Sequence, residues 1–173
     1  MPDLLTHVLL TYALATILSG RYRWISGGYV TVAMAGALVP DLNHVTSIVP
    51  SPMVSELLAI PFDWGGLQTG GVVCLLLIAI ATLFEQSERR RVAALLAVGA
   101  VSHLLTDALI RTPDGRSQSL FWPVTRYQPP TPGLYTSTDL WPLILAACLA
   151  AVSWYVVRYR EQNAYTPQRR YDE

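Results

Sequence analysis

The sequence predicts an all-α protein, a multi-pass membrane bundle of about five hydrophobic helices with a polar His/Asp site at one end. Three observations support this. Of its 173 residues, 52% are hydrophobic and only 14% are charged, whereas soluble domains average about 25% charged residues. Apolar runs recur along the chain, and the segments between them carry most of the arginines. The formal net charge is zero, which argues against a nucleic-acid partner and leaves the lipid bilayer as the expected one.

Each apolar run predicts one helix, and the runs cover residues 4–19, 28–39, 71–84, 92–110 and 139–157. The first superficially resembles a signal peptide but lacks a basic segment before it, so we expect a retained helix. Its length corresponds to about 24 Å, slightly short for a bilayer core of about 30 Å. The run 28–39 is shorter still and must be tilted, half-inserted or extended through Gly27 and Gly28. We therefore expect a membrane-embedded domain over 1–157 and a polar tail over 158–173.

The connecting segments predict interface structure. Residues 51–62, SPMVSELLAIPF, are typical of a short amphipathic helix at the membrane surface, capped by Ser51 or Ser55. Residues 111–138 are rich in Pro, Gly, Ser and Thr and predict a loop on the site face. Aromatic residues in this loop and in the last run are expected to anchor at the interface: Phe121, Trp122, Tyr127, Trp141 and Trp154. The two cysteines, Cys74 and Cys148, lie in apolar runs, and we expect them to pack as small apolar residues.

The arginines predict the topology. With the N-terminus outside and all runs crossing, nine of the twelve arginines are cytoplasmic, as the positive-inside rule favours. Only Arg111, Arg116 and Arg126 then lie outside. This places the N-terminus on the outer face and the C-terminus in the cytoplasm. The assignment depends on the run 28–39, because the later helices invert if it does not cross.

Histidines and aspartates gather at one end in this topology. His7 lies early in the first run, and Asp41 and His44 follow the second run in VPDLNH. His103 and Asp107 lie four residues apart in VSHLLTDALI, which places them on one face of a helix. Imidazole and carboxylate groups together bind zinc, manganese or iron. No Ser or Cys is placed as an evident nucleophile, so water activated by a metal ion is the simplest hydrolytic mechanism.

Structural roles are the alternative for each of these residues. His7 alone could hydrogen-bond to a neighbouring threonine, and Asp41 could cap the following turn. His103 and Asp107 could bond only to each other or to a neighbouring helix. Asp63 could simply cap the third apolar helix. Because ionisable groups at membrane depth are costly and usually functional, a shared polar site is the favoured interpretation for the set without Asp63.

Four motifs together resemble a known family. They are MPDLLTH, PDLNH, HLLTD and the segment from Gly115 to Pro123 with the pattern G-x5-FWP. In this order they are similar to the YdjM-like family of LexA-regulated, membrane-bound metal-dependent hydrolases, over residues 1–157. The resemblance implies a metal-ligand role for His7, Asp41, His44, His103 and Asp107. It also suggests a distant likeness to zinc-dependent phospholipase C, and hence a phosphoester or phospholipid substrate.

One position departs from the family pattern. Near the start of the third apolar run the family usually has a further histidine, where this chain has Gln68 before Thr69. Glutamine can donate or accept a hydrogen bond but is a poor zinc ligand. The departure calls a second metal ion and full catalytic competence into question.

The expected function is therefore a membrane-bound hydrolase that uses a divalent metal, zinc first and manganese or iron as alternatives, on a phosphoester or lipid-like substrate. Asp41 or Asp107 could instead orient a histidine or act as the general base, which makes them the candidate catalytic residues. Weaker candidates for substrate binding are Asp63, Gln68, Arg111 and Arg116, with interface anchoring as the alternative for the arginines. The alternative function is a non-catalytic membrane protein whose His/Asp network is structural or only binds metal. A relay for metal or proton movement is disfavoured, because the polar residues crowd at one end.

Overall fold

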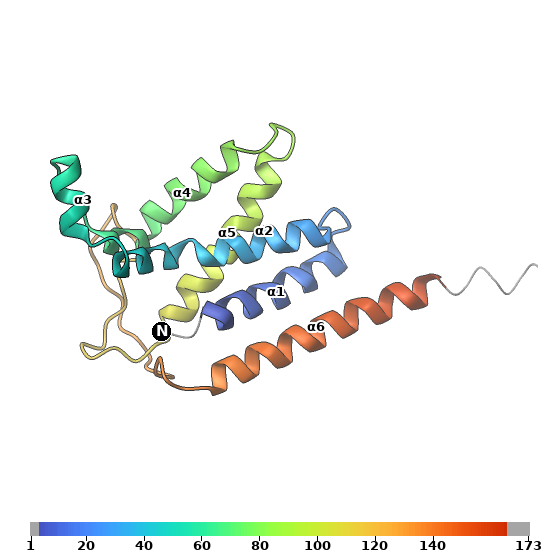
Figure 1. Ribbon diagram of the computed structural model, residues 1–173. Helices are drawn as coiled ribbons and strands as arrows, with labels where there is room; N and C mark the ends of the chain where they lie inside the picture. Colours follow the sequence, from blue (N-terminus) through green and yellow to red (C-terminus); the bar gives the residue numbers. More distant parts are fainter. Residues whose placement is uncertain (1–3, 166–173) are drawn as a thin grey trace, which may run out of the picture.

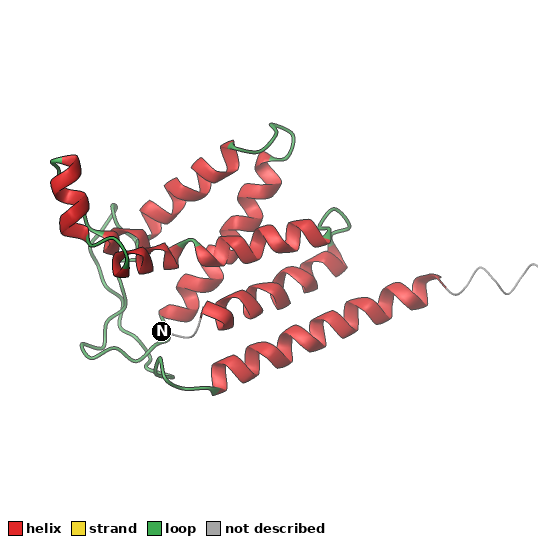
Figure 2. Ribbon diagram, in the orientation of Figure 1, coloured by secondary structure: helices red, strands yellow, loops and turns green. Residues whose placement is uncertain are grey.

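The computed structural model describes residues 4–165, and within this range the chain is all-helical (Figure 2). The predicted all-α class is confirmed for these residues, which contain no strand and only two isolated β-bridges. The elements in order are α1 (Leu4–Arg21), α2 (Gly27–Leu38), the 3-10 helix η1 (Pro40–Ser47), α3 (Ser51–Leu58), the 3-10 helix η2 (Trp64–Gln68), α4 (Gly70–Thr82), α5 (Arg89–Asp107) and α6 (Trp141–Tyr165).

Each predicted apolar run forms one helix, with shifted ends. The helix α5 stops at Asp107, so Leu109 and Ile110 belong to the following segment. The helix α6 continues to Tyr165, so the expected polar tail is helical over 158–165, and residues 166–173 lie outside the described range. Polar side chains at this end do not stop the helix, because arginine, glutamate and glutamine are good helix formers.

Two helices are long and apolar enough to cross a membrane, namely Leu4–Arg21 and the segment Trp141–Arg160 of α6. The other apolar helices, α2 and α4, are shorter. Large apolar side chains point outward from the bundle, among them Leu75 on α4, Leu105 on α5 and Val152 on α6. Exposed apolar side chains in this number are typical of contact with lipid or with another protein.

The five long helices run between two ends of the molecule (Figure 1). One end holds the turns after α1 and α4 and the later part of α6; here it is called the arginine end, because it carries Arg21, Arg23, Arg89–Arg91, Arg158 and Arg160. The opposite end, here called the site end, holds η1, η2 and the segment 108–140. The helix α2 connects one end to the other.

Small residues allow α2 and α5 to approach closely. A Cβ atom added at Gly99 would lie 2.0 Å from the carbonyl oxygen of Ala33, and one added at Gly36 would lie 2.2 Å from that of Leu96. Side chains from α4 and α5 complete the core beside this crossing, including Val73, Leu77, Val92 and Leu96. Glycine at such crossings lets two helix backbones come into contact, and here the contact fixes α5 relative to the start of η1.

Two smaller expectations were wrong. Neither Ser51 nor Ser55 caps α3, which follows Pro50 and has no side-chain cap. Instead the Ser55 hydroxyl accepts a hydrogen bond from the backbone N–H of Phe62 at 3.0 Å and so closes the loop after the helix. Cys74 and Cys148 are exposed rather than packed in the core, because each falls on the outward face of an apolar helix.

Candidate metal centre

His7, His103 and Asp107 meet at the site end. His7 lies at the start of α1, while His103 and Asp107 occupy the last turns of α5, one helical turn apart. The Nε2 atom of His7 lies 3.3 Å from Oδ1 of Asp107, and Nε2 of His103 lies 3.2 Å from Oδ2 of the same carboxylate. The two imidazole rings stack with their centroids 3.8 Å apart. One carboxylate therefore faces two histidines from different helices.

These side chains are buried and lack ordinary partners. His103 is fully buried and His7 is 2% exposed. Both ring nitrogens of His103, Nδ1 of His7 and Oδ1 of Asp107 are buried without a hydrogen bond in the described part of the chain. Buried polar atoms are nearly always hydrogen-bonded, and exceptions call for an explanation such as an ion. The cluster is thus short of partners at the atoms that could hold a ligand.

Asp41 lies beside this cluster. It follows Pro40 in the first turn of η1, and its Oδ1 atom is 3.6 Å from Nε2 of His103. Burial raises the pKa of the Asp41 carboxyl, although the imidazoles of His103 and His7 act to lower it. A buried carboxylate is costly without a compensating positive charge. Asp41 does not cap η1, whose first turn has no side-chain cap, so the capping alternative is wrong.

His44 lies at the edge of the site. Its Nδ1 atom is 3.0 Å from the carbonyl oxygen of Asp41 and 3.7 Å from the Oδ1 atom of the same residue, and its side chain is 54% exposed. It does not join the compact group of His7, His103 and Asp107. The structure thus brings three of the five expected ligands together, places Asp41 next to them, and leaves His44 outside.

The compact group of His7, His103 and Asp107, called the metal group below, could hold a metal ion, because one ligand atom from each of its residues lies within 4.8 Å of the others. Two ligand atoms bound about 2.0–2.1 Å from a tetrahedral zinc ion are about 3.3 Å apart. The His7 nitrogen lies 3.3 Å from Oδ1 of Asp107 and the His103 nitrogen lies 3.2 Å from Oδ2, so each histidine is close to this spacing from one of the two carboxylate oxygens. Two histidines and one carboxylate also form a donor set found in zinc hydrolases, with a position left open. The residues therefore fit a divalent ion.

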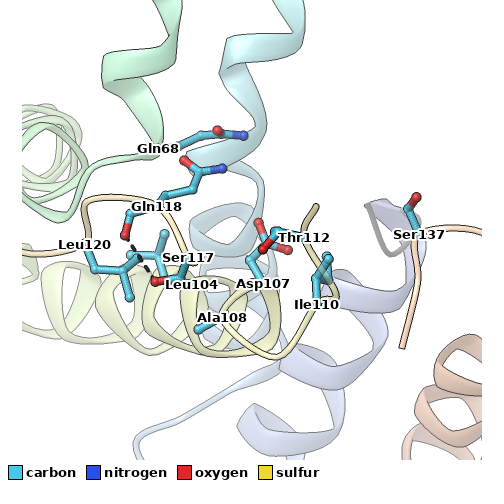
Figure 3. A pocket seen from close by; sticks show the side chains of 10 residues that line it. All are labelled: Gln68, Leu104, Asp107, Ala108, Ile110, Thr112, Ser117, Gln118, Leu120 and Ser137. Carbon is cyan, nitrogen blue, oxygen red and sulfur yellow. Dashed lines mark hydrogen bonds between the residues drawn. The ribbon is translucent and has the colours of Figure 1, made fainter. Parts of the chain in front are cut away.

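A cavity of about 160 Å³ opens beside Asp107 (Figure 3). Its walls come from η2, from the end of α5 and from the segment after it. The lining residues are Gln68, Leu104, Asp107, Ala108, Ile110, Thr112, Ser117, Gln118, Leu120 and Ser137. Asp107 belongs both to the metal group and to this wall, so a molecule bound in the cavity would lie next to the cluster.

The segment 111–138 forms part of this wall because it docks on the start of α4. The backbone N–H groups of Gly70 and Gly71 donate to the carbonyl oxygens of Leu120 and Trp122, at 3.0 and 2.9 Å. The first N–H groups of a helix have no partner within the helix, so the loop supplies them. A Cβ atom at Gly70 would lie 2.2 Å from the carbonyl oxygen of Leu120, which explains why a residue without a side chain stands there.

The other sequence candidates are placed differently. Gln68 lines the cavity. Asp63 does not cap α4; its side chain accepts a hydrogen bond from Gly65 N–H at 2.9 Å and caps η2. Arg111 donates to the carbonyl of Gly133, and neither Arg111 nor Arg116 lines the cavity.

Sequence reasoning missed the loop residues of the wall, among them Ser117 and Gln118. The glycine pair Gly70–Gly71, which contacts the FWP segment, is the feature that could have indicated them, because glycines allow close backbone contact. The chain matches no family model, no curated protein and no solved structure. Function is therefore inferred from the residues of the site.

Proposed function

We propose that this protein is a membrane-bound hydrolase that depends on one divalent metal ion, with zinc as the first candidate. The observation that supports this most directly is the compact group of His7, His103 and Asp107, whose buried nitrogen and oxygen atoms lack hydrogen-bond partners. The motifs PDLNH and HLLTD, which resemble those of the YdjM-like family, contain both His103 and Asp107 and the adjacent Asp41. The resemblance supports the same proposal independently of the geometry.

Each residue has a distinct part in this proposal. His7, His103 and Asp107 hold the ion, which when bound would lower the pKa of a water molecule and polarise a substrate oxygen. Asp41 borders the ligand group without belonging to it, and in our proposal it accepts the proton of the attacking water. His44 lies on the exposed side of Asp41, 3.7 Å from its Oδ1 atom, and in our proposal it orients this carboxylate.

The proposed location is the cell membrane, with the site end on the outer face. Support comes from the two helices long enough to cross a bilayer. Support for the orientation comes from the arginine end, since positive charge favours the cytoplasmic side. A cysteine placed at Arg116, in a chain whose Cys74 and Cys148 are replaced, should react from outside with an impermeant thiol reagent. Reaction only after cell lysis would overturn the orientation.

Metal analysis of the purified protein tests the central proposal. The full chain in detergent, loaded with zinc or manganese and then dialysed, should retain about one ion per chain by elemental mass spectrometry. The variant His103→Ala should lose it. His44→Ala is the matched control, because it removes a histidine of the same motif region that lies outside the compact group, and it should retain the ion. A wild-type protein that holds neither metal would refute the proposal.

The second candidate function is a non-catalytic one, in which the His/Asp cluster stabilises the bundle. One observation favours it: the cluster joins α1, α5 and η1. Turnover of a panel of phosphodiesters and carboxylic esters separates the two functions. Metal binding with no turnover, together with a large loss of thermal stability in His103→Ala, would favour the structural role. Turnover that requires His103 would exclude it.

A further inference from the structure

The cavity beside the metal group has the chemistry of a site for an uncharged ligand. Among its ten lining residues the only ionisable one is Asp107, and no arginine, lysine or histidine contributes to the wall. Of the other nine lining residues, four are apolar, namely Leu104, Ala108, Ile110 and Leu120, and five are polar but uncharged. Phosphate groups are bound in proteins by arginine, lysine or the free N–H groups of a helix start. This wall offers none of the cationic side chains.

The nearest helix start is not free to bind an anion either. The helix α4 begins at the site end, directly after η2. Its first two N–H groups, those of Gly70 and Gly71, already donate to Leu120 and Trp122. The protein groups that could recognise a phosphate are thus either absent from the wall or already used by the loop, which leaves only the proposed metal ion to bind one. This weighs against the phosphoester expected from the family resemblance.

Besides Asp107, one further polar residue in the wall has a buried atom without a partner. Gln68 is 7% exposed, and its Nε2 atom is buried without a hydrogen bond. The hydroxyls of Thr112 and Ser117 differ, because they donate to the backbone carbonyls of Arg116 and Gln118. In Figure 3 the Gln68 side chain reaches toward the cavity from the same side as Gln118, with the Asp107 carboxylate across from them. A buried N–H group with no partner costs free energy unless a ligand accepts from it.

From these features we infer that the cavity binds an uncharged acyl group, whose carbonyl oxygen accepts a hydrogen bond from Nε2 of Gln68 while its carbon chain lies against the apolar wall. The volume of about 160 Å³ is close to that of an engineered cavity that accepts benzene, so a short acyl chain fits. The inference rests on the proposed hydrolase function and names its substrate class, a carboxylic ester or amide. Hydrolysis would add the hydroxyl of water to the carbonyl carbon, break the C–O or C–N bond, and give the proton to the leaving alcohol or amine.

Gln68 then has a role that a histidine could not fill equally well. A glutamine amide stays neutral and always carries N–H donors, so it donates to a carbonyl oxygen at any pH. A histidine at this position would add a ligand for a second ion. The departure from the family pattern is, in this inference, a change of substrate rather than a loss of function.

Binding of small probes to the full-length protein in detergent tests the inference. Trifluorobutyramide represents the neutral acyl group, trifluoroethyl phosphate represents the phosphoester, and fluorine NMR titration gives both dissociation constants. The protein is used free of metal, so that neither probe can bind through the ion. We expect the amide to bind more tightly than the phosphate, and Gln68→Leu to weaken the amide by about fivefold, the usual effect of one hydrogen bond. Gln128→Leu makes the same substitution at an exposed residue outside the cavity and should leave binding unchanged.

A second variant guards against misfolding of the first. Ala108→Leu adds carbon atoms to the apolar wall without touching Gln68, and should abolish amide binding because it fills the cavity. Preferred binding of the phosphate, or amide binding that neither variant affects, would overturn the inference. The outcome is independent of metal analysis: a chain that binds the amide but no metal keeps this site and loses the hydrolase proposal. With metal present, release of nitrophenol from nitrophenyl butyrate and of nitroaniline from butyryl nitroanilide then separates ester hydrolysis from amide hydrolysis.

Discussion

The glycine crossing between α2 and α5 makes a sharp prediction for Gly99→Ala. The added Cβ atom would lie 2.0 Å from the carbonyl oxygen of Ala33 and 2.6 Å from the backbone nitrogen of Ala37. Both neighbours are backbone atoms, so no side chain can rotate away. An ordinary contact begins near 3.4 Å, and the two helices must therefore separate locally by about 1.4 Å to relieve the closest clash.

That separation has a calculable effect on stability. Overpacking of a well-packed core costs about 1–3 kcal/mol, and replacing glycine by alanine within a helix returns up to about 1 kcal/mol. The net loss of about 1–2 kcal/mol corresponds to a fall of about 2–8 °C in the unfolding midpoint for a chain of this size. Circular dichroism on heating in detergent measures it. Gly27→Ala is the matched control, because no atom lies within 4 Å of its added Cβ.

The same shift reaches the metal group. His103 lies one helical turn after Gly99, and Asp41 follows α2, with 3.6 Å between His103 Nε2 and Asp41 Oδ1. A shift of about 1.4 Å widens this gap to about 5 Å, so metal affinity should fall by about tenfold, as when an outer partner of a metal ligand is lost. If Gly99→Ala unfolds at the same temperature as Gly27→Ala and binds metal equally well, the crossing does not position the site and the reasoning is wrong.

Three further predictions concern the surroundings of the site. In Gly71→Ala the added Cβ would lie 2.4 Å from the carbonyl oxygen of Trp122. The variant should therefore displace the loop and weaken binding of trifluorobutyramide in the NMR titration, while its metal content stays constant. A parallel loss of metal would contradict the expectation that the loop does not position the metal ligands. Asp41→Asn should lower turnover strongly but metal affinity no more than about 10–100-fold, and unchanged turnover would remove Asp41 from the reaction. Tyr135→Phe deletes a hydrogen bond to the carbonyl of Thr106 and should cost about 1 kcal/mol in thermal unfolding. Burial raises the pKa of the Tyr135 phenol, so the folded state keeps a proton that the unfolded state loses above about pH 10. The free energy of unfolding of the wild type should therefore fall more steeply than that of Tyr135→Phe as the pH rises past 10. Parallel curves of the two proteins against pH would contradict this.

The recurring apolar runs were enough to predict helices α1, α2, α4, α5 and α6. Each run formed a helix because its residues have little alternative to burial or lipid contact, and the breaks fell at polar segments such as 85–88. Spacing alone also predicted that His103 and Asp107 share a face. Their contact with His7 could not be predicted in detail, because it depends on how α1 packs against α5, a tertiary relation that no local pattern encodes.

Loops were harder to predict than helices. The sequence indicated that 111–138 lacks regular structure, but its position on α4 follows from two backbone hydrogen bonds at Gly70 and Gly71. Backbone bonds leave little trace in side-chain identity beyond the glycines themselves. The exclusion of His44 from the compact group was likewise hidden, since the three-residue spacing from Asp41 fits a metal pair as well as it fits the observed 3-10 turn.

Because the loop docks on α4, the metal ligands and part of the cavity wall lie on different elements of the protein. The metal group stands on α1 and α5, whereas Leu120 of the cavity wall is held by Gly70 of α4. A loop of different composition could be exchanged between Arg116 and Pro123 while the ligands stay in place. The composition of this part of the cavity wall can thus vary while His7, His103 and Asp107 keep their positions, so that one set of ligands could stand beside differently lined cavities.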